Sequence, residues 1–113
     1  MMNSCQKRYH SIYLQQKEKF DSKVIEWIDT KEEIIITTPN TNPFLKHEFS
    51  KIKIRRYKTG KLRILYAIST ESPNLFTPPL TNEIKEVIFL YVDLRSDNTY
   101  KEASKLLKKG NLL

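Results

Sequence analysis

A continuous apolar run, Val87–Val92, constrains the fold of this chain most strongly. Its sequence Val-Ile-Phe-Leu-Tyr-Val has no polar alternation and is typical of a central β-strand that is covered on both faces. The chain has 113 residues, which is enough for one small domain whose core needs no disulfide or metal. We therefore expect residues 1–113 to form a single domain in which this strand is central.

Two helices are predicted before this strand and one after it. Residues 7–19 carry a sparse apolar stripe at helical spacing, and Asp21 or its neighbour can cap a second helix. The β-branched run 34–38 fits either the end of that helix or extended chain. No convincing β-strand precedes the helices. Residues 99–102, Thr-Tyr-Lys-Glu, have the form of a capping box that opens a last helix, which ends near Gly110.

Between these helices, residues 50–68 have the pattern of a β-hairpin. Residues 50–57 alternate in period two, with Ile52 and Ile54 on the buried side. The open side of this strand is predicted to carry Lys51, Lys53, Arg55 and Tyr57. Residues 58–61, Lys-Thr-Gly-Lys, are a turn signal, and residues 62–68 supply the second strand. A long connection, 69–86, then leads to the apolar strand.

The net charge of +7 lies in a single window of the sequence. Residues 1–45 carry six basic and six acidic residues, and so do residues 64–113, whereas residues 46–63 carry eight basic residues and one acid. Three cations in line on one strand face are about 6–7 Å apart and are costly to hold together unless an anion binds there. The window therefore indicates a nucleic-acid partner. The alternative is a solvated edge strand whose lysines prevent aggregation.

The sequence argues against several other classes of protein. It has no apolar run of membrane-spanning length and no signal-peptide core, and Cys5 has no cysteine partner, so we expect a cytoplasmic protein. His10 and His47 do not form a zinc-binding pattern, and two glycines are too few for a phosphate-binding loop. We therefore expect no metal and no cofactor.

Basic side chains can nevertheless support the cleavage of RNA by its own 2′-hydroxyl. This reaction needs a base, cations around the crowded phosphate and a proton for the leaving oxygen. A lysine can act as a base when neighbouring cations lower its pKa. Lys53, between two cations of its strand and expected near Arg63 across the hairpin, is the best candidate. Arg95 follows the apolar strand, and Tyr100 either packs in the core or stacks on a base.

The segment 51–66, Lys-Ile-Lys-Ile-Arg-Arg-Tyr-Lys-Thr-Gly-Lys-Leu-Arg-Ile-Leu-Tyr, resembles the central hairpin of RelE-type toxins. These are messenger-RNA interferases of the RelE/ParE superfamily. Their pattern is a Lys-x-Lys-x-Arg strand, a turn with Gly, and an Arg shortly before a Tyr. An apolar strand, an Arg and a Tyr that opens the C-terminal helix follow, and here Val87–Val92, Arg95 and Tyr100 match them. The resemblance covers about residues 45–109.

Three departures from the family pattern accompany this resemblance. The family begins with a β-strand, for which we find no signal in this sequence. The connection 69–86 is longer than usual, and the spacing from Arg95 to Tyr100 is one residue shorter than in the best-known member.

The resemblance implies an α/β (α+β) fold in which two N-terminal helices pack on a twisted, mainly antiparallel sheet, followed by a C-terminal helix. It also implies a toxin of a type II toxin–antitoxin system that cleaves mRNA in the ribosomal A site, needs no metal, and is silenced by a cognate antitoxin.

The roles implied by position concern five residues. Lys53 would be the general base, Lys51 and Arg63 would stabilise the phosphate, Arg95 would act electrostatically on the leaving group, and Tyr100 would stack on the mRNA. Further contacts with RNA are expected from Lys46, Arg55, Arg56, Lys58 and Lys61. Two other functions stay open: a non-catalytic module that binds RNA or the ribosome, and a gyrase-directed toxin of the ParE type.

Overall fold

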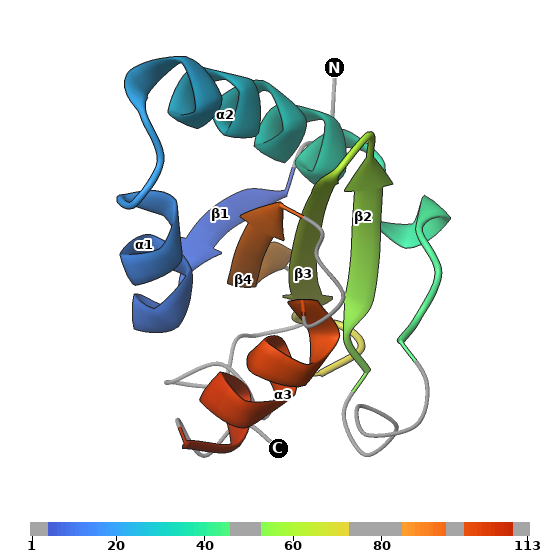
Figure 1. The fold of residues 1–113 in the computed structure, drawn as a ribbon. Helices are drawn as coiled ribbons and strands as arrows, with labels where there is room; N and C mark the ends of the chain where they lie inside the picture. Colours follow the sequence, from blue (N-terminus) through green and yellow to red (C-terminus); the bar gives the residue numbers. More distant parts are fainter. Residues whose placement is uncertain (1–4, 46–52, 73–84, 95–98, 110–113) are drawn as a thin grey trace.

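The computed structural model describes residues 5–45, 53–72, 85–94 and 99–109, and these form an α+β fold (Figure 1). Along the chain the elements are β1 (Gln6–Tyr9), α1 (Ser11–Lys17), α2 (Ser22–Thr37), the 3₁₀ turn η1 (Pro39–Thr41), β2 (Arg55–Thr59), β3 (Leu62–Ile68), β4 (Glu86–Leu94) and α3 (Thr99–Lys109). Within the described residues the strands form one sheet in the order β1-β4-β3-β2. β1 runs parallel to β4, and the other two pairs are antiparallel.

The apolar run is the centre of this sheet, as the sequence predicts. β4 lies between β1 and β3, and its residues from Glu86 to Val92 are buried. A bulge interrupts its pairing with β3, because Leu65 lies opposite Tyr91 while Tyr66 lies opposite Phe89. The expectation of a strand that is covered on both faces is confirmed.

The two faces of the sheet are covered by different helices (Figure 1). Alternate residues of β3, such as Ile64 and Tyr66, join Tyr13 of α1 and Ile28 of α2 in one core cluster. The residues between them pack on the other side, where the second cluster contains Leu65, Ala67, Leu90, Ala103 and Leu107. We call these two sides the α1–α2 face and the α3 face. The period of two therefore sorts β3 side chains between the two helical layers.

The N-terminal residues form a strand, so the expectation of a helix from residue 7 without a preceding strand is wrong. β1 pairs with β4 in parallel, and Arg8 Nε lies 2.8 Å from Glu86 Oε2. The ring of Tyr9 stacks on Phe89, with 5.5 Å between the ring centroids. The sequence Gln-Lys-Arg-Tyr has no apolar alternation, and the strand exists because β4 offers an edge to pair with.

The two N-terminal helices begin at identifiable caps. Nδ1 of His10 accepts a hydrogen bond from the backbone of Ile12 at 3.1 Å and caps α1, and burial lowers the pKa of His10. The Asp21 carboxylate accepts one from Val24 N at 3.0 Å and caps α2, as predicted. α2 continues to Thr37, so the β-branched run that fitted either state is helical up to that residue.

The hairpin forms with the predicted turn, while its first strand differs from the prediction. Gly60 has φ of +54° in the turn, a conformation that favours glycine, and β3 covers the residues expected. β2, however, begins at Arg55, where an arginine expected on an open face is buried. The long connection beyond Ser72 and the helix end at Gly110 lie outside the described residues.

In the part of the chain that the structure describes, no helix has the length and apolar character needed to cross a membrane.

Candidate nucleic-acid interface

The strand register places basic residues of the hairpin in two adjacent rows on the α3 face. Lys58 lies opposite Arg63, and Arg63 lies opposite Asp93 of β4. In the next row on this face, Arg56 lies opposite Leu65, which belongs to the α3-side cluster. Paired residues point to the same side of a sheet, so Arg56, Lys58 and Arg63 share the α3 face.

Within the residues that the structure describes, these three cations have no acidic partner. Arg63 is buried, with 7% of its surface exposed, and its Nη1 donates to the carbonyls of Gly60 at 2.7 Å and Leu62 at 3.0 Å. Nε of Arg56 is buried without a hydrogen-bond partner, and Lys58 is exposed. Among the described residues no ion pair joins any of the three to a carboxylate. Because neighbouring cations repel one another unless an anion lies among them, this arrangement is suited to an external anion.

Asp93 marks one boundary of this group of cations. Its carboxylate accepts hydrogen bonds from Tyr91 Oη at 3.1 Å and from its neighbour Leu94 N at 2.8 Å. Burial, helped by the charge of Asp93, raises the pKa of Tyr91, so that hydroxyl stays protonated and donates. The Asp93 carboxylate is therefore bonded to groups of its own strand, β4. Arg56 and Lys58, which have no acidic partner among the described residues, lie on the β2 side of Arg63.

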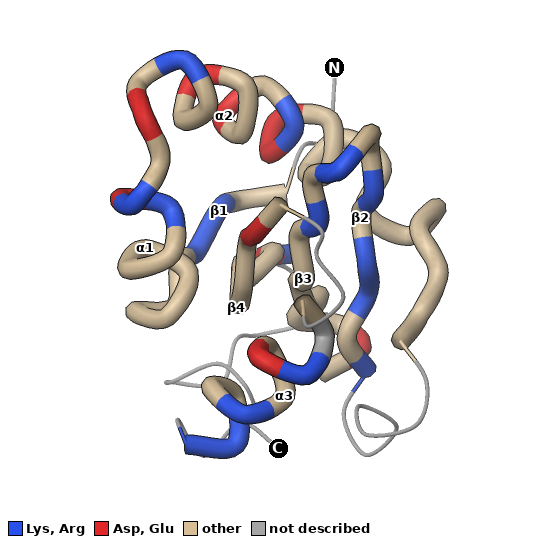
Figure 2. The backbone as a smooth tube through the Cα atoms, in the orientation of Figure 1, with Lys and Arg blue, Asp and Glu red and all other residues tan. Residues whose placement is uncertain are grey.

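Helix α3 adds positive charge on the same side of the sheet (Figure 2). Its buried side carries Ala103 and Leu107, while Lys101 and Lys105 are exposed. Lys108 and Lys109 are also exposed, and Glu102 is the one acid in the helix. The helix itself was predicted, but counting charges by segment missed its positive charge, because its lysines were averaged with acids of β4 and the preceding connection. The helical period of the apolar residues was the signal that could have revealed it.

Lys53 lies apart from this group. It precedes β2 and is exposed, and its Nζ is 5.8 Å from the centroid of the Phe44 ring. The guanidinium carbon of Arg55 lies 3.9 Å from the same ring centroid, so Lys53 is next to Arg55. Lys58 rather than Lys53 faces Arg63 across the hairpin. The expectation that Lys53 is near Arg63 is therefore wrong.

Arg55 belongs to the scaffold of the α1–α2 face. Its Nε and Nη2 donate to the two carboxylate oxygens of Glu71 at 2.9 and 2.5 Å, and its Nη1 donates to the carbonyls of Asn40 and Asn42. The hydrogen bonds to Glu71 raise the pKa of Arg55, although burial opposes this. The prediction that Arg55 projects freely toward RNA is wrong, because Arg55 is paired with Glu71. The sequence pattern did not reveal this partner.

Among the other predicted site residues, the structure describes some and not others. Lys61 is exposed in the hairpin turn. Tyr100 lies in the first turn of α3, but its side chain lies outside what the structure describes. Lys46, Lys51 and Arg95 also lie outside the described residues.

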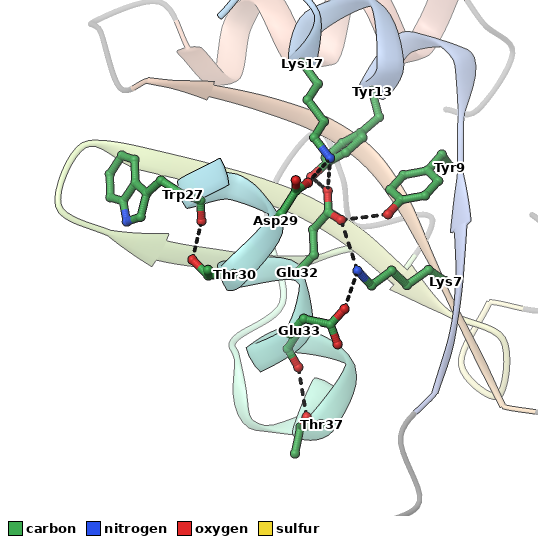
Figure 3. Close-up of polar contacts among 10 residues, drawn as sticks. All are labelled: Lys7, Tyr9, Tyr13, Lys17, Trp27, Asp29, Thr30, Glu32, Glu33 and Thr37. Atoms are coloured by element: carbon green, nitrogen blue, oxygen red, sulfur yellow. Dashed lines mark hydrogen bonds and ion pairs between the residues drawn. The ribbon is translucent and has the colours of Figure 1, made fainter. Parts of the chain in front are cut away.

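A second charged cluster surrounds Glu32 on the α1–α2 face (Figure 3). Glu32 is fully buried, and its Oε1 accepts from Tyr9 Oη at 2.7 Å and from Lys7 Nζ at 3.4 Å. Its Oε2 accepts from Tyr13 Oη at 2.7 Å and from Lys17 Nζ at 2.9 Å. The cluster thus joins β1, α1 and α2 through one carboxylate.

This cluster is closed and serves the fold. Lys17 also contacts Asp29 at 2.5 Å, and Lys7 contacts Glu33 at 2.6 Å, so each lysine has two acidic partners. Burial alone would lower the pKa of Lys17, but its hydrogen bonds to the acids outweigh burial and raise it. Burial, together with the charge of Glu32, raises the pKa of Tyr13. These groups keep their protons and already have partners, which leaves none available as an acid or base.

Comparison with known proteins supports the fold. No protein-family model matches the sequence, and no curated protein matches it significantly. One chain of the crystal structure of the RelBE2 toxin–antitoxin complex from Mycobacterium tuberculosis has a similar structure, with a TM-score of 0.62 and 17% sequence identity. The match covers 86% of this chain and 98% of that one. It confirms the RelE-like α+β fold that the hairpin motif predicted.

Proposed function

We propose that this protein is the toxin of a type II toxin–antitoxin pair and an endoribonuclease that cleaves mRNA in the ribosomal A site. The observation that carries the proposal is the group of cations Arg56, Lys58 and Arg63 on the α3 face, none of which forms an ion pair with an acid of the described residues. The similarity in fold to a chain of a toxin–antitoxin complex adds support. The resemblance of the hairpin motif to RelE-type toxins supplies the reaction.

The chemistry fits this charge pattern. When the 2′-oxygen of RNA attacks the adjacent phosphate, negative charge grows on the non-bridging oxygens, and cations that are already in place stabilise it. Arginine suits this task because it stays protonated and presents several donors in one plane. Arg63, anchored through Nη1 by two backbone carbonyls, is held in a fixed orientation before RNA arrives.

The remaining roles follow from the family resemblance. Lys51 acts on the phosphate with Arg63, Arg95 stabilises the leaving oxygen, and Tyr100 stacks on a base of the mRNA. The resemblance also assigns the general base to Lys53, but the position of Lys53 beside Phe44 and away from Arg63 argues against this role. Lys46, Arg56, Lys58, Lys61 and the lysines of α3 contribute attraction for the mRNA and ribosomal RNA.

The basic surface indicates what kind of antitoxin segment would bind to it. A surface with an excess of cations is best covered by an acidic or amphipathic segment, which would block access of RNA.

A cleavage assay in a translating extract tests the proposal. Wild-type protein is expected to cut a reporter mRNA within codons that occupy the A site, with the cut ends mapped by primer extension. Arg63→Ala is expected to abolish cutting, and Arg63→Lys, which keeps the charge but loses the planar fork, to retain part of it. Lys23→Ala, a loss of one exposed charge on α2, is the matched control and is expected to cut normally.

Other outcomes contradict the proposal in distinct ways. Intact mRNA together with salt-sensitive ribosome binding would indicate a non-catalytic module. DNA damage with normal translation would indicate a gyrase-directed toxin. Circular dichroism of each variant shows whether a loss of cutting reflects a loss of folding.

A further inference from the structure

We propose that Lys58 acts with Arg63 on the scissile phosphate, and that Lys53 lies too far from this phosphate to serve as the base. This inference rests on the proposed function and changes the position of the reactive site within the hairpin. It places the phosphodiester of the RNA over the β2–β3 pair on the α3 face. Arg56, next along this face of β2, contacts the neighbouring phosphate.

Register is the first argument. Lys58 and Arg63 are directly paired, so their backbones are about 5 Å apart and their side chains leave the same face. Lys53 precedes Lys58 by five residues, which is about 17 Å of extended chain. A single phosphate is too small to contact cations this far apart.

The side of the sheet is the second argument. Lys53 and Arg55 share the ring of Phe44, and Arg55 is held by Glu71 on the α1–α2 face. The pairing partner of Arg55 is Tyr66, which belongs to the α1–α2 core cluster. The sheet thus separates the Lys53 side from the side on which Arg63 lies.

Charge is the third argument. Arg63 has a cation, Lys58, on one side and a carboxylate, Asp93, on the other. The carboxylate repels a phosphate, so the anion binds toward β2. There the Nε of Arg56 is buried and has no hydrogen-bond partner among the described residues, and Lys58 is exposed and unpaired within them. Lys58 and Arg63 therefore suit one RNA phosphate, and Arg56 lies beside them for the next phosphate.

The reaction at this position is a transesterification. The 2′-oxygen forms a bond to phosphorus as its proton passes to water, and the bond from phosphorus to the 5′-oxygen breaks. The 5′-oxygen then takes a proton from water, which leaves a 2′,3′-cyclic phosphate and a 5′-hydroxyl. Lys58 and Arg63 stabilise the extra negative charge on the phosphoryl oxygens and exchange no proton with the substrate.

Single-turnover cleavage on mRNA-programmed ribosomes tests this assignment with full-length protein. Lys58→Ala is expected to slow cleavage by about 100-fold, comparable to the loss of one preorganised charge-stabilising donor. Lys58→Arg is expected to stay within about tenfold of wild type, because a cation is retained. Lys53→Ala is expected to lose less than about fivefold, since it removes only a more distant charge. Lys23→Ala again serves as the control of equal charge and is expected to cut at the wild-type rate.

The outcomes separate this inference from the proposed function. If wild-type protein leaves the mRNA intact, both are wrong. If wild-type protein cuts, and Lys53→Ala abolishes cutting while Lys58→Ala does not, the proposed function holds and the Lys58 assignment is overturned. Failure of Lys58→Arg to cut, when Lys58→Ala also fails, would contradict a purely electrostatic role. Thermal melting of each variant identifies any loss that comes from unfolding.

Discussion

The two faces of the sheet hold cations in opposite ways. On the α1–α2 face, Lys7 and Lys17 contact Glu32, and Arg55 contacts Glu71. On the α3 face, Arg56 and Lys58 have no acidic partner among the described residues. Arg55 and Arg56 are consecutive in the sequence, yet the strand directs one into an ion pair and the other toward an open basic surface.

This difference shows that the net charge of +7 combines two kinds of cation: those paired with internal acids, and those without an acidic partner among the described residues. Internal acids neutralise Lys7, Lys17 and Arg55 on the first face, and these ion pairs join helices and turns to the sheet. The cations of the second face repel one another, a cost that an arriving anion removes. Function is therefore expected where the charges are unpaired, and stability where they are paired.

The substitution with the largest expected effect on stability removes the buried acid Glu32. Glu32→Ala leaves Tyr9 and Tyr13 without their acceptor and takes a carboxylate from Lys7 and Lys17. We expect the free energy of unfolding to fall by about 3–5 kcal/mol, as for a broken buried ion pair. Chemical denaturation measures this change. Glu33→Ala, which removes an exposed acid from the same helix, is expected to cost less than about 1 kcal/mol. Equal losses in both variants would contradict a special role for Glu32.

A smaller test uses the two consecutive arginines. Arg55→Ala removes the hydrogen bonds to Glu71 and is expected to lower the free energy of unfolding by about 2 kcal/mol. Arg56→Ala has no ion pair to lose, so we expect less than about 1 kcal/mol in stability but weaker RNA binding. Denaturation and ribosome co-sedimentation on both variants give the comparison. The reverse pattern, with Arg55→Ala stable and weak in binding, would overturn the division between the faces.

Much of the fold could be predicted because its signals are local. The apolar run of β4, the turn at Gly60 and the cap at Asp21 each depend on residues within a few positions. β1 could not be predicted in this way, since its pairing with β4 joins segments about 80 residues apart in sequence, and its own pattern is polar.

The sequence placed the basic residues in one segment but did not assign each of them correctly to a face of the sheet. Charge counting identified the basic hairpin. The face of the sheet to which each basic side chain points, however, depends on which residues pair across the hairpin. The alternation around Ile52 and Ile54 placed Arg55 on the open side, whereas Ile54 and Arg55 are both buried. An ion pair between Arg55 and Glu71, sixteen residues later in the chain, decides that outcome and leaves no local signal.

The salt dependence of binding to mRNA-programmed ribosomes tests the central claim most directly. It compares Arg56→Ala/Lys58→Ala with Lys19→Ala/Lys23→Ala, a double variant that removes the same charge from exposed positions just before and within α2. If the unpaired cations contact phosphates, the slope of log affinity against log salt falls by about 2 in the first variant and stays at the wild-type value in the second. Equal slopes in the two variants would contradict the claim, because only total charge would then matter.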